Sequence, residues 1–228
     1  MSDFVIPAPP QPVVPVAGGD FFPVRRVFCI GRNYAGHARE MGHDPEREPP
    51  FFFTKPADAL VIAGADTPYP PATSDLHHEI ELVVAIGREA TSITSAMALE
   101  CVWGYAAGID LTRRDLQAEA KRLARPWDMA KAFDCSAPIG ELVPAARIGH
   151  PHAGRVALTV NGKLRQEGDL AEMIWAVPDA IAFLSGFVTL MPGDLVFTGT
   201  PTGVAAIVRG DRLEGSIAGV GTVTTTIA

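Results

Sequence analysis

Hydrophobic and polar positions alternate over residues 79–86, whose sequence is EIELVVAI. Successive side chains of a β-strand point to opposite faces, so this pattern predicts a strand with one face in a core. The four even-numbered positions are all isoleucine, leucine or valine and form that face. The other face begins with Glu79 and Glu81 and continues with Val83 and Ala85. Two carboxylates therefore point the same way, next to apolar positions that indicate partial burial.

The rest of the chain predicts more strands and a few short helices. Strand-like runs cover residues 24–31, 51–55 and 104–110, and the phenylalanines at 51–53 are expected in the core. Asn161-Gly162 lies between two alternating runs and predicts a β-hairpin. Helical spacing covers 94–102, a segment of about 14 residues with Thr112 as its N-cap, and a segment from Pro178 to about Gly186. Together these elements predict a β-rich α+β fold with a mixed, largely antiparallel sheet.

Prolines separate the first 23 residues from the remainder of the chain. Six of them fall in this segment. Proline lacks a backbone N–H and has a fixed φ, so the segment predicts an extended arm along the surface. A chain of 228 residues is long enough for one large domain. We therefore expect an N-terminal arm over 1–23 and a single catalytic domain over 24–228.

Composition and charge exclude several classes of protein. The formal net charge is −7, and no basic stripe interrupts it, so nucleic acid is not an expected partner. The chain contains no run of apolar residues long enough for a membrane span, and its first residues lack a cationic stretch and an unbroken apolar run, so neither membrane insertion nor export is expected. Its three cysteines are odd in number and widely spaced, which predicts neither disulfides nor a zinc site. These features favour a cytoplasmic protein.

A third acidic residue, Asp110, ends a short strand-like run and makes a cation site the preferred interpretation. Three carboxylates at Glu79, Glu81 and Asp110 offer only oxygen ligands, which suit Mg²⁺, Mn²⁺ or Ca²⁺ better than zinc. The alternative is an edge strand whose two glutamates are solvated.

Six segments, taken together, resemble the fumarylacetoacetate hydrolase family. They are GRNYAGHAREMG (31–42), FFTKPADAL (52–60), HHEIELVVAIG (77–87), GIDLTRRDLQ (108–117), KAFD (131–134) and GDLVFTGTPTGV (193–204). The resemblance is to the short, single-domain acylpyruvase branch, and within it to members that act on fumarylpyruvate in the gentisate pathway. It implies a rolled mixed sheet with few helices, a divalent metal, Mg²⁺ or Mn²⁺, held by three carboxylates, and a homodimer.

The resemblance also implies roles for individual residues. It assigns the metal to the same three carboxylates, water activation to His37 with Glu40 as its partner, and the substrate's carbonyl oxygen to Lys131. Arg114, Gln117 and Thr200 match positions that bind the substrate. Each assignment has a simpler alternative. His37 and Glu40 could be a surface pair, Lys131 could cover apolar surface with its stem, and Thr200 could only shape a turn. Arg114 and Gln117 could be ordinary polar residues of a helix surface.

The implied activity is metal-dependent hydrolysis of a C–C bond in a β-diketo acid. Fumarylpyruvate would give fumarate and pyruvate. Two other activities occur in the family and remain alternatives: decarboxylation of a β-keto acid such as oxaloacetate, and isomerisation or decarboxylation in homoprotocatechuate degradation. A metal-binding protein without catalysis is a third alternative.

Overall fold

A mixed β-sheet forms the centre of the computed structural model, which describes residues 4–36, 49–62 and 64–228. Its strands run in the order β4-β3-β14-β7-β8-β10-β5, and β11 also pairs with β8. The pairs β3/β14 and β5/β10 are parallel and the other pairs are antiparallel. The strands are β3 (Arg26–Gly31), β4 (Phe51–Lys55), β5 (Leu60–Ile62), β7 (Ile80–Ile86), β8 (Val102–Ile109), β10 (Ala137–Ile139), β11 (Val143–Pro144) and β14 (Asp194–Phe197).

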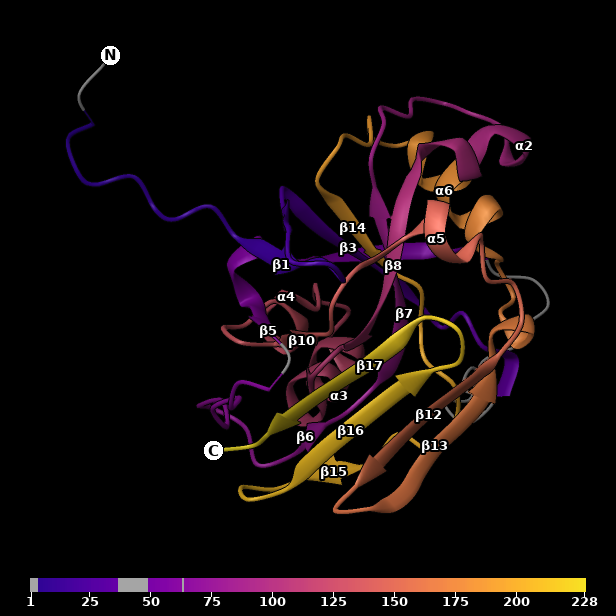
Figure 1. The fold of residues 1–228 in the computed structure, drawn as a ribbon. Coiled ribbons are helices and arrows are strands. Elements are labelled where there is room, and N and C mark those ends of the chain that lie inside the picture. The colour runs from indigo at the N-terminus through magenta and orange to yellow at the C-terminus, as the bar shows by residue number, and fades with distance from the viewer. Residues whose placement is uncertain (1–3, 37–48, 63) are drawn as a thin grey trace.

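A second, antiparallel sheet lies across the first, in front of it in Figure 1. Its order is β13-β12-β16-β17, from β12 (Arg155–Val160), β13 (Lys163–Asp169), β16 (Arg212–Ile217) and β17 (Gly221–Thr226). The predicted hairpin is confirmed as β12 and β13. Asn161 and Gly162 join them with φ of 52° and 73°, the left-handed values that this two-residue turn requires.

Two hydrophobic clusters cover the opposite faces of the central sheet, so the predicted strand at 79–86 is buried on both sides rather than one. The even-numbered side chains of β7 pack in a cluster with the second sheet and with helix α6 (Val177–Ser185). Val83 and Ala85 belong to the other cluster. Every residue of β7 is buried because the strand lies in the middle of the sheet with a layer on each face.

Part of the proline-rich N-terminal segment belongs to the second of these hydrophobic clusters. Residues 4–11 are exposed and extend away from the body in Figure 1. The prediction of a surface arm does not hold beyond them. Strands β1 (Val13–Pro15) and β2 (Phe21–Pro23) form an antiparallel pair, and Val14, Val16 and Phe22 are buried against the central sheet. Prolines are tolerated here because the pair has only two strands, so both are edges.

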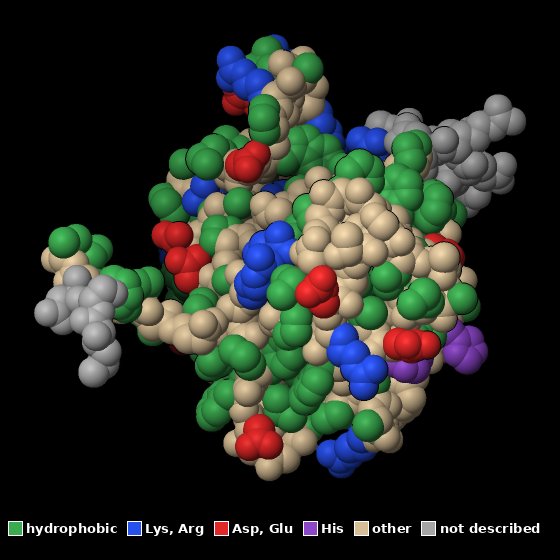
Figure 2. Space-filling view, turned by 90° about the horizontal axis from the view of Figure 1, so that it is seen from above, with side chains coloured by type: hydrophobic (Ala, Val, Ile, Leu, Met, Phe, Trp, Pro, Cys, Tyr) green, Lys and Arg blue, Asp and Glu red, His purple; other side chains and the backbone are tan. Residues whose placement is uncertain are grey.

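The helices that lie wholly within the described residues are short. They are α2 (Ser95–Ala98), α3 (Arg114–Arg122), α4 (Asp128–Lys131), α5 (Ala145–Ile148) and α6, with 3₁₀ turns at Ala57–Ala59, Leu99–Cys101 and Leu170–Glu172. Helix α6 confirms the prediction made from Pro178. In the described residues no helix has the length and apolar character needed to cross a membrane. On the face drawn in Figure 2, acidic and basic side chains are interspersed rather than separated by sign.

The predicted N-cap at Thr112 is wrong. Thr112 and Arg113 form strand β9, which pairs with β6 (Leu76–His77), and β6 also pairs with β15 (Ala206–Ile207). The helix therefore begins at Arg114, one residue later than an N-cap at Thr112 would give, and Arg113 occupies the N-cap position. Thr112 is fully buried and its hydroxyl accepts a hydrogen bond from Lys131, so tertiary contacts take the side chain away from the capping role.

Candidate metal centre and substrate pocket

Antiparallel pairing of β7 with β8 brings the three predicted carboxylates together. Ile80 pairs with Ile109, which places the start of one strand beside the end of the other. Glu79 immediately precedes β7, Glu81 is its second residue, and Asp110 directly follows β8. The Asp110 N–H donates to the Glu79 carbonyl at 2.8 Å and fixes this end of the ladder. The register of β7 with β8 therefore brings the three acidic residues together in one cluster.

The cluster is buried and has the donor set of a hard-cation site. One carboxylate oxygen from each of Glu79, Glu81 and Asp110 lies within 4.8 Å of the others. The three residues are 5%, 2% and 0% exposed. Three carboxylates in this arrangement offer only oxygen, as Mg²⁺, Mn²⁺ and Ca²⁺ require.

Three cations share the cluster with these acids. Lys131 Nζ lies 2.9 Å from Glu79 Oε2 and 2.6 Å from Asp110 Oδ2. Lys55 Nζ lies 2.8 Å from Asp110 Oδ1, and Arg114 Nη2 lies 2.5 Å from Glu79 Oε1. Within the described residues, these ion pairs all involve Glu79 or Asp110 and none involves Glu81.

Glu81 is the acid of the cluster whose surroundings favour a bound cation. Within the described residues it has no ion pair, and its Oε2 accepts one hydrogen bond, from the Gly199 N–H at 2.7 Å. Burial, and after it the charges of Asp110 and Glu79, raise the pKa of Glu81 well above its usual value, while Lys131 and the Gly199 N–H act in the opposite direction. Carboxylates crowded out of water in this way are stabilised by a bound cation, so the residues fit a divalent ion.

Lys131 lies inside the cluster, and its placement bears on the predicted contact with the substrate's carbonyl. An ammonium group has three N–H donors. In the structure these face Glu79, Asp110 and the Thr112 hydroxyl, the last at 2.5 Å. Burial lowers the pKa of Lys131, but the nearby Asp110 and Glu79 outweigh it and raise the pKa overall. The side chain is 2% exposed and does not cover apolar surface as a solvated lysine would.

The loop after β14 places Thr200 beside the acids. Gly199 has φ of 92°, and a Cβ there would lie 2.7 Å from the Asn33 side chain, so the turn requires glycine. Thr200 donates its hydroxyl to the Ile80 carbonyl at 2.8 Å and accepts from Gln166 Nε2 at 2.8 Å. The prediction that Thr200 binds the substrate stays a prediction.

Gln166 is a buried residue of the site that the sequence analysis missed. It lies on β13, and its Oε1 meets His78 Nδ1 at 2.8 Å and accepts from the Ile80 N–H at 3.1 Å. One side chain thereby connects the second sheet to the strand that carries Glu81 and to the loop that carries Thr200. No local pattern distinguishes Gln166, because its role depends on packing between two sheets. His78, which had no predicted role, orients this amide through its Nδ1.

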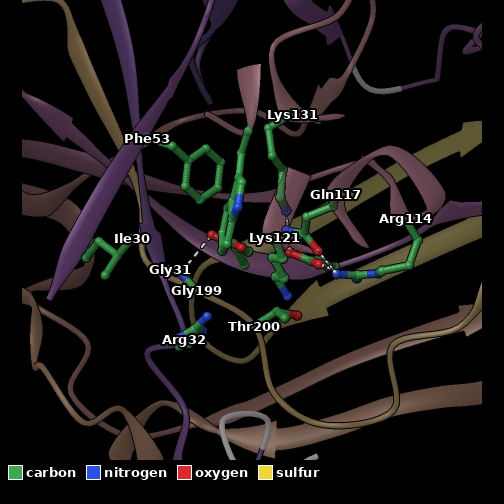
Figure 3. A pocket seen from close by; sticks show the side chains of 13 residues that line it. Ile30, Gly31, Arg32, Phe53, Arg114, Gln117, Lys121, Lys131, Gly199 and Thr200 are labelled. Carbon is green, nitrogen blue, oxygen red and sulfur yellow. Dashed lines mark hydrogen bonds and ion pairs between the residues drawn. The ribbon is translucent and has the colours of Figure 1, made fainter. Parts of the chain in front are cut away.

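One face of α3 lines the pocket. Arg114, Gln117 and Lys121 are spaced i, i+3, i+7, and all three border the cavity that contains Glu79 and Glu81 (Figure 3). Gln117 is buried and its Oε1 accepts from Arg114 Nη1 at 2.6 Å. The helix therefore presents polar groups toward the acids, as the predicted binding roles of Arg114 and Gln117 require. Lys121 was missed, although its helical spacing was a usable signal.

Aromatic side chains form the opposite wall. Phe51, Phe52 and Phe53 are half-buried. Phe52 and Phe53 pack against the two hydrophobic clusters, so the prediction that these rings lie in the core holds only in part. Strand β4 is at the edge of the sheet, which leaves these rings with an open side. With Trp127 they line an outer cleft of about 600 Å³ that shares Arg32 and Lys131 with the inner pocket.

His37 and Glu40 lie outside the described residues. Lys55, which had no predicted role, is the last residue of β4 and is 3% exposed. Besides its contact with Asp110, its Nζ donates to the Leu111 carbonyl at 3.1 Å and to the Lys131 carbonyl at 2.5 Å. A lysine at the end of an aromatic strand was the available signal for its burial. Lys55 holds Asp110 and the segment around Lys131 in place.

A β-rich fold with a buried, all-oxygen carboxylate cluster next to a polar pocket fits the class of proteins that hold a hard divalent cation. Comparison with known proteins gives the family. The family model described as fumarylacetoacetate (FAA) hydrolase C-terminal matches residues 26–228. The chain belongs to the fumarylacetoacetate hydrolase family.

This chain is similar in sequence to known proteins from different organisms. The crystal structure of fumarylpyruvate hydrolase from Pseudomonas aeruginosa, in complex with Mn²⁺ and pyruvate, is 51% identical, with a TM-score of 0.97 and coverage of 99% of both chains. Fumarylpyruvate hydrolase from a Ralstonia species is 42% identical over 81% of this chain and 95% of its own. The mitochondrial oxaloacetate tautomerase FAHD1 from Rattus norvegicus is 43% identical over 86% of this chain and 88% of its own. The predicted rolled, mixed-sheet fold is thus confirmed.

Proposed function

We propose that this protein is a divalent-metal-dependent hydrolase that cleaves the C–C bond of acylpyruvates, with fumarylpyruvate as the preferred substrate. The observation that carries the proposal is the buried cluster of Glu79, Glu81 and Asp110 at the end of a polar pocket. Support comes from a relative that is 51% identical and binds Mn²⁺ and pyruvate. Pyruvate is one of the two products expected here.

Mn²⁺ or Mg²⁺ is the proposed ion, and Glu79, Glu81 and Asp110 are its proposed ligands. When bound, the ion would polarise the α-keto group of the substrate and favour departure of pyruvate as its enolate. Arg114 and Gln117 border the same pocket and present N–H donors that suit the carboxylate of the pyruvoyl end. Thr200 is the third proposed contact.

Water supplies the second half of the reaction. We assign His37 as the base that takes a proton from water and Glu40 as the residue that orients it, an assignment that rests on the sequence motif. The hydroxide attacks the distal acyl carbonyl, and the bond between that carbon and the methylene of the pyruvoyl group breaks. The methylene carbon then takes up a proton. One water is consumed, and fumarate and pyruvate are formed from fumarylpyruvate.

A substrate panel tests the reaction. Fumarylpyruvate, maleylpyruvate, acetylpyruvate and oxaloacetate are each incubated with Mn²⁺ or Mg²⁺, with and without a chelator, and the products are identified. We expect fumarate and pyruvate from fumarylpyruvate, and loss of activity with the chelator. His37→Ala should lower the rate of hydrolysis by about 10²- to 10⁴-fold with metal affinity intact. Cleavage that persists in that variant, or products formed in the presence of chelator, would contradict the mechanism.

Oxaloacetate chemistry is the second candidate function, because relatives 43% identical carry the name oxaloacetate tautomerase. The decarboxylase alternative matches them only in part, since the substrate is shared but the named reaction is a tautomerisation. Enol–keto conversion of oxaloacetate moves one proton between carbon and oxygen and releases no CO₂. The panel distinguishes the cases: loss of the enol absorbance without pyruvate formation supports tautomerisation, and release of CO₂ supports decarboxylation.

Assembly, location and pathway are further proposals. A homodimer and a role in gentisate degradation follow from the family resemblance, and size-exclusion chromatography with light scattering tests the dimer. A cytoplasmic location is supported by three cysteines that are all free thiols.

A further inference from the structure

Two cations lie over the same indole ring at the outer side of the pocket. Lys121 Nζ is 5.1 Å from the centroid of Trp127, and Arg32 Cζ is 5.9 Å from it. All three residues line the cavity that contains Glu79 and Glu81, and Figure 3 shows Lys121 and Arg32 on the side of this cavity away from Lys131. The site therefore has a cationic outer end in addition to its acidic inner end.

Lys121 differs from the other lysines of the site in its electrostatic surroundings. Lys55 and Lys131 each contact a carboxylate within 3 Å. Lys121 has no ion pair with any residue that the structure describes. Burial, followed by the charges of Arg114 and Arg32, lowers the pKa of Lys121 to about 8, and the more distant Glu79 only partly offsets them. A half-buried cation next to other cations is destabilised unless an anion joins it.

The inner carboxylates do not supply that anion. Glu79 is held by Arg114 and Lys131, and Asp110 by Lys55 and Lys131. A divalent ion at the cluster would take up what remains of their negative charge. The positive potential around Lys121 is therefore available to a ligand in the pocket that Lys121 lines together with Arg32 and Trp127.

We propose that Lys121, with Arg32 over the same Trp127 ring, binds a second carboxylate at the far end of the acyl arm. The preferred substrates are then acylpyruvates with two carboxylates, one at each end. This inference rests on the proposed function and specifies its substrate class. The flat faces of Trp127 and Phe53, which tilt toward each other with centroids 6.1 Å apart, suit an unsaturated, planar arm.

Four proteins test the proposal: wild type, Lys121→Met, Lys121→Arg and Arg122→Met. Methionine keeps the length of the stem and removes the charge. Arg122 is the next residue of α3 and is exposed, so Arg122→Met controls for loss of one positive charge from the same helix turn. Each protein is assayed with fumarylpyruvate, which carries a carboxylate on its arm, and with acetylpyruvate, which does not.

We expect Lys121→Met to lower the ratio of kcat/KM for fumarylpyruvate to kcat/KM for acetylpyruvate by about 10- to 100-fold, the worth of one charge-assisted hydrogen bond. Most of the change should lie in KM. Lys121→Arg should retain the ratio to within a few-fold, and Arg122→Met should leave it unchanged. An equal fall for both substrates, or no change for either, would overturn the proposal.

A binding measurement separates this proposal from the proposed function. Fumarate, which is the acyl arm alone, is titrated calorimetrically into the Mn²⁺-loaded forms of the same four proteins. Fumarate affinity should fall about tenfold or more in Lys121→Met only. Failure of wild type to cleave any acylpyruvate would refute the function and leave the fumarate result to decide the subsite. Cleavage together with equal fumarate affinity in all four proteins, or with no fumarate binding, would refute the subsite alone.

Discussion

Two buried carboxylate sites of this fold differ in how completely cations compensate them: every acid is ion-paired at Asp194, but in the metal-site cluster Glu79 and Asp110 are ion-paired and Glu81 is not, within the described residues. Asp194, at the start of β14, is fully buried and faces two guanidinium groups: Arg26 Nη2 lies 2.7 Å from its Oδ2, and Arg25 Nη1 lies 3.2 Å from its Oδ1. The Met191 N–H also donates to it at 2.9 Å. In the second group, Glu79, Glu81 and Asp110 lie together, and Glu81 has a hydrogen bond from one backbone N–H.

The difference distinguishes a structural carboxylate from one that waits for a ligand. At Asp194 two cations and a backbone donor satisfy one acid and join β14 to β3, whose Arg26 is its register partner. In the cluster, three acids of the same sign are gathered where burial and mutual repulsion raise the pKa of Glu81. Burial alone does not indicate function, since both groups are buried. The informative feature is Glu81, which lies beside two other acids and has no ion pair within the described residues, whereas Asp194 has two.

Glu81→Gln gives the largest expected effect. It should lower kcat/KM by more than about 10³-fold, because the ion's contribution amounts to several kcal/mol of transition-state stabilisation. Thermal stabilisation by Mn²⁺ should disappear as well. The metal-free protein should lose no more than about 1 kcal/mol of unfolding free energy, since the amide oxygen can still accept from Gly199 and a like charge is removed. A large loss of metal-free stability would place Glu81 with the structural carboxylates.

Lys131→Met tests the cation shared by Glu79 and Asp110. Removal of this charge should lower kcat by about 10²- to 10³-fold, as for other buried donors at reacting centres. Metal-free stability should also fall, because two buried acids lose their partner. Steady-state kinetics and denaturant unfolding measure the two effects. A variant with normal kcat and reduced stability would make Lys131 a purely structural residue.

Asp194→Asn should have the opposite effects to those expected for Glu81→Gln: reduced stability with metal binding retained. Breaking the pair should lower the unfolding free energy by about 2–3 kcal/mol, a reduced value for a buried pair because both arginines are partly solvated. The side chains of Arg25 and Arg26 are 47% and 33% exposed. The affinity for Mn²⁺, measured by calorimetry, should stay within about twofold of the wild-type value. Impaired metal binding in this variant would break the proposed division between the two groups.

The smallest effect concerns pH and the cationic outer end. Burial and then the charges of Arg114 and Arg32 lower the pKa of Lys121 to about 8, with Lys131 acting in the same direction and Glu79 against it. As pH rises from 7 to 9, Lys121 loses its proton, so the preference for fumarylpyruvate over acetylpyruvate should fall by up to about tenfold. Groups common to both reactions cancel in this ratio. His77 nearby has a lowered pKa because of burial, so it is already neutral over this range.

Lys121→Arg provides the control for that profile, because a guanidinium remains charged throughout. The ratio should then be independent of pH between 7 and 9. A profile in Lys121→Arg identical to that of wild type would show that another group titrates.

Several elements could be predicted from local sequence. Alternation identified β7, Asn161-Gly162 identified the hairpin between β12 and β13, and Pro178 identified α6. These signals depend on backbone preferences and on side-chain period, which act within a few residues. Where a tertiary contact competed, prediction failed: Thr112 pairs in a strand and accepts from Lys131 instead of capping a helix. The core prediction for the phenylalanines of β4 holds only in part, because that strand lies at an edge and one side of its rings lines a cleft.

By itself, the sequence determined which acids form the cluster, the β-rich class of fold and the family, because residue types and their order carry that information directly. Tertiary structure alone decided the charge pattern of the pocket. The register of β7 with β8 sets the spacing of the carboxylates, and packing of β4, α3 and α4 brings Lys55, Arg114 and Lys131 to them. Lys121 lines the same pocket over the ring of Trp127, without an ion pair to any described residue. Electrostatic interaction depends on distance and burial, and both are fixed only when segments far apart in the chain pack together.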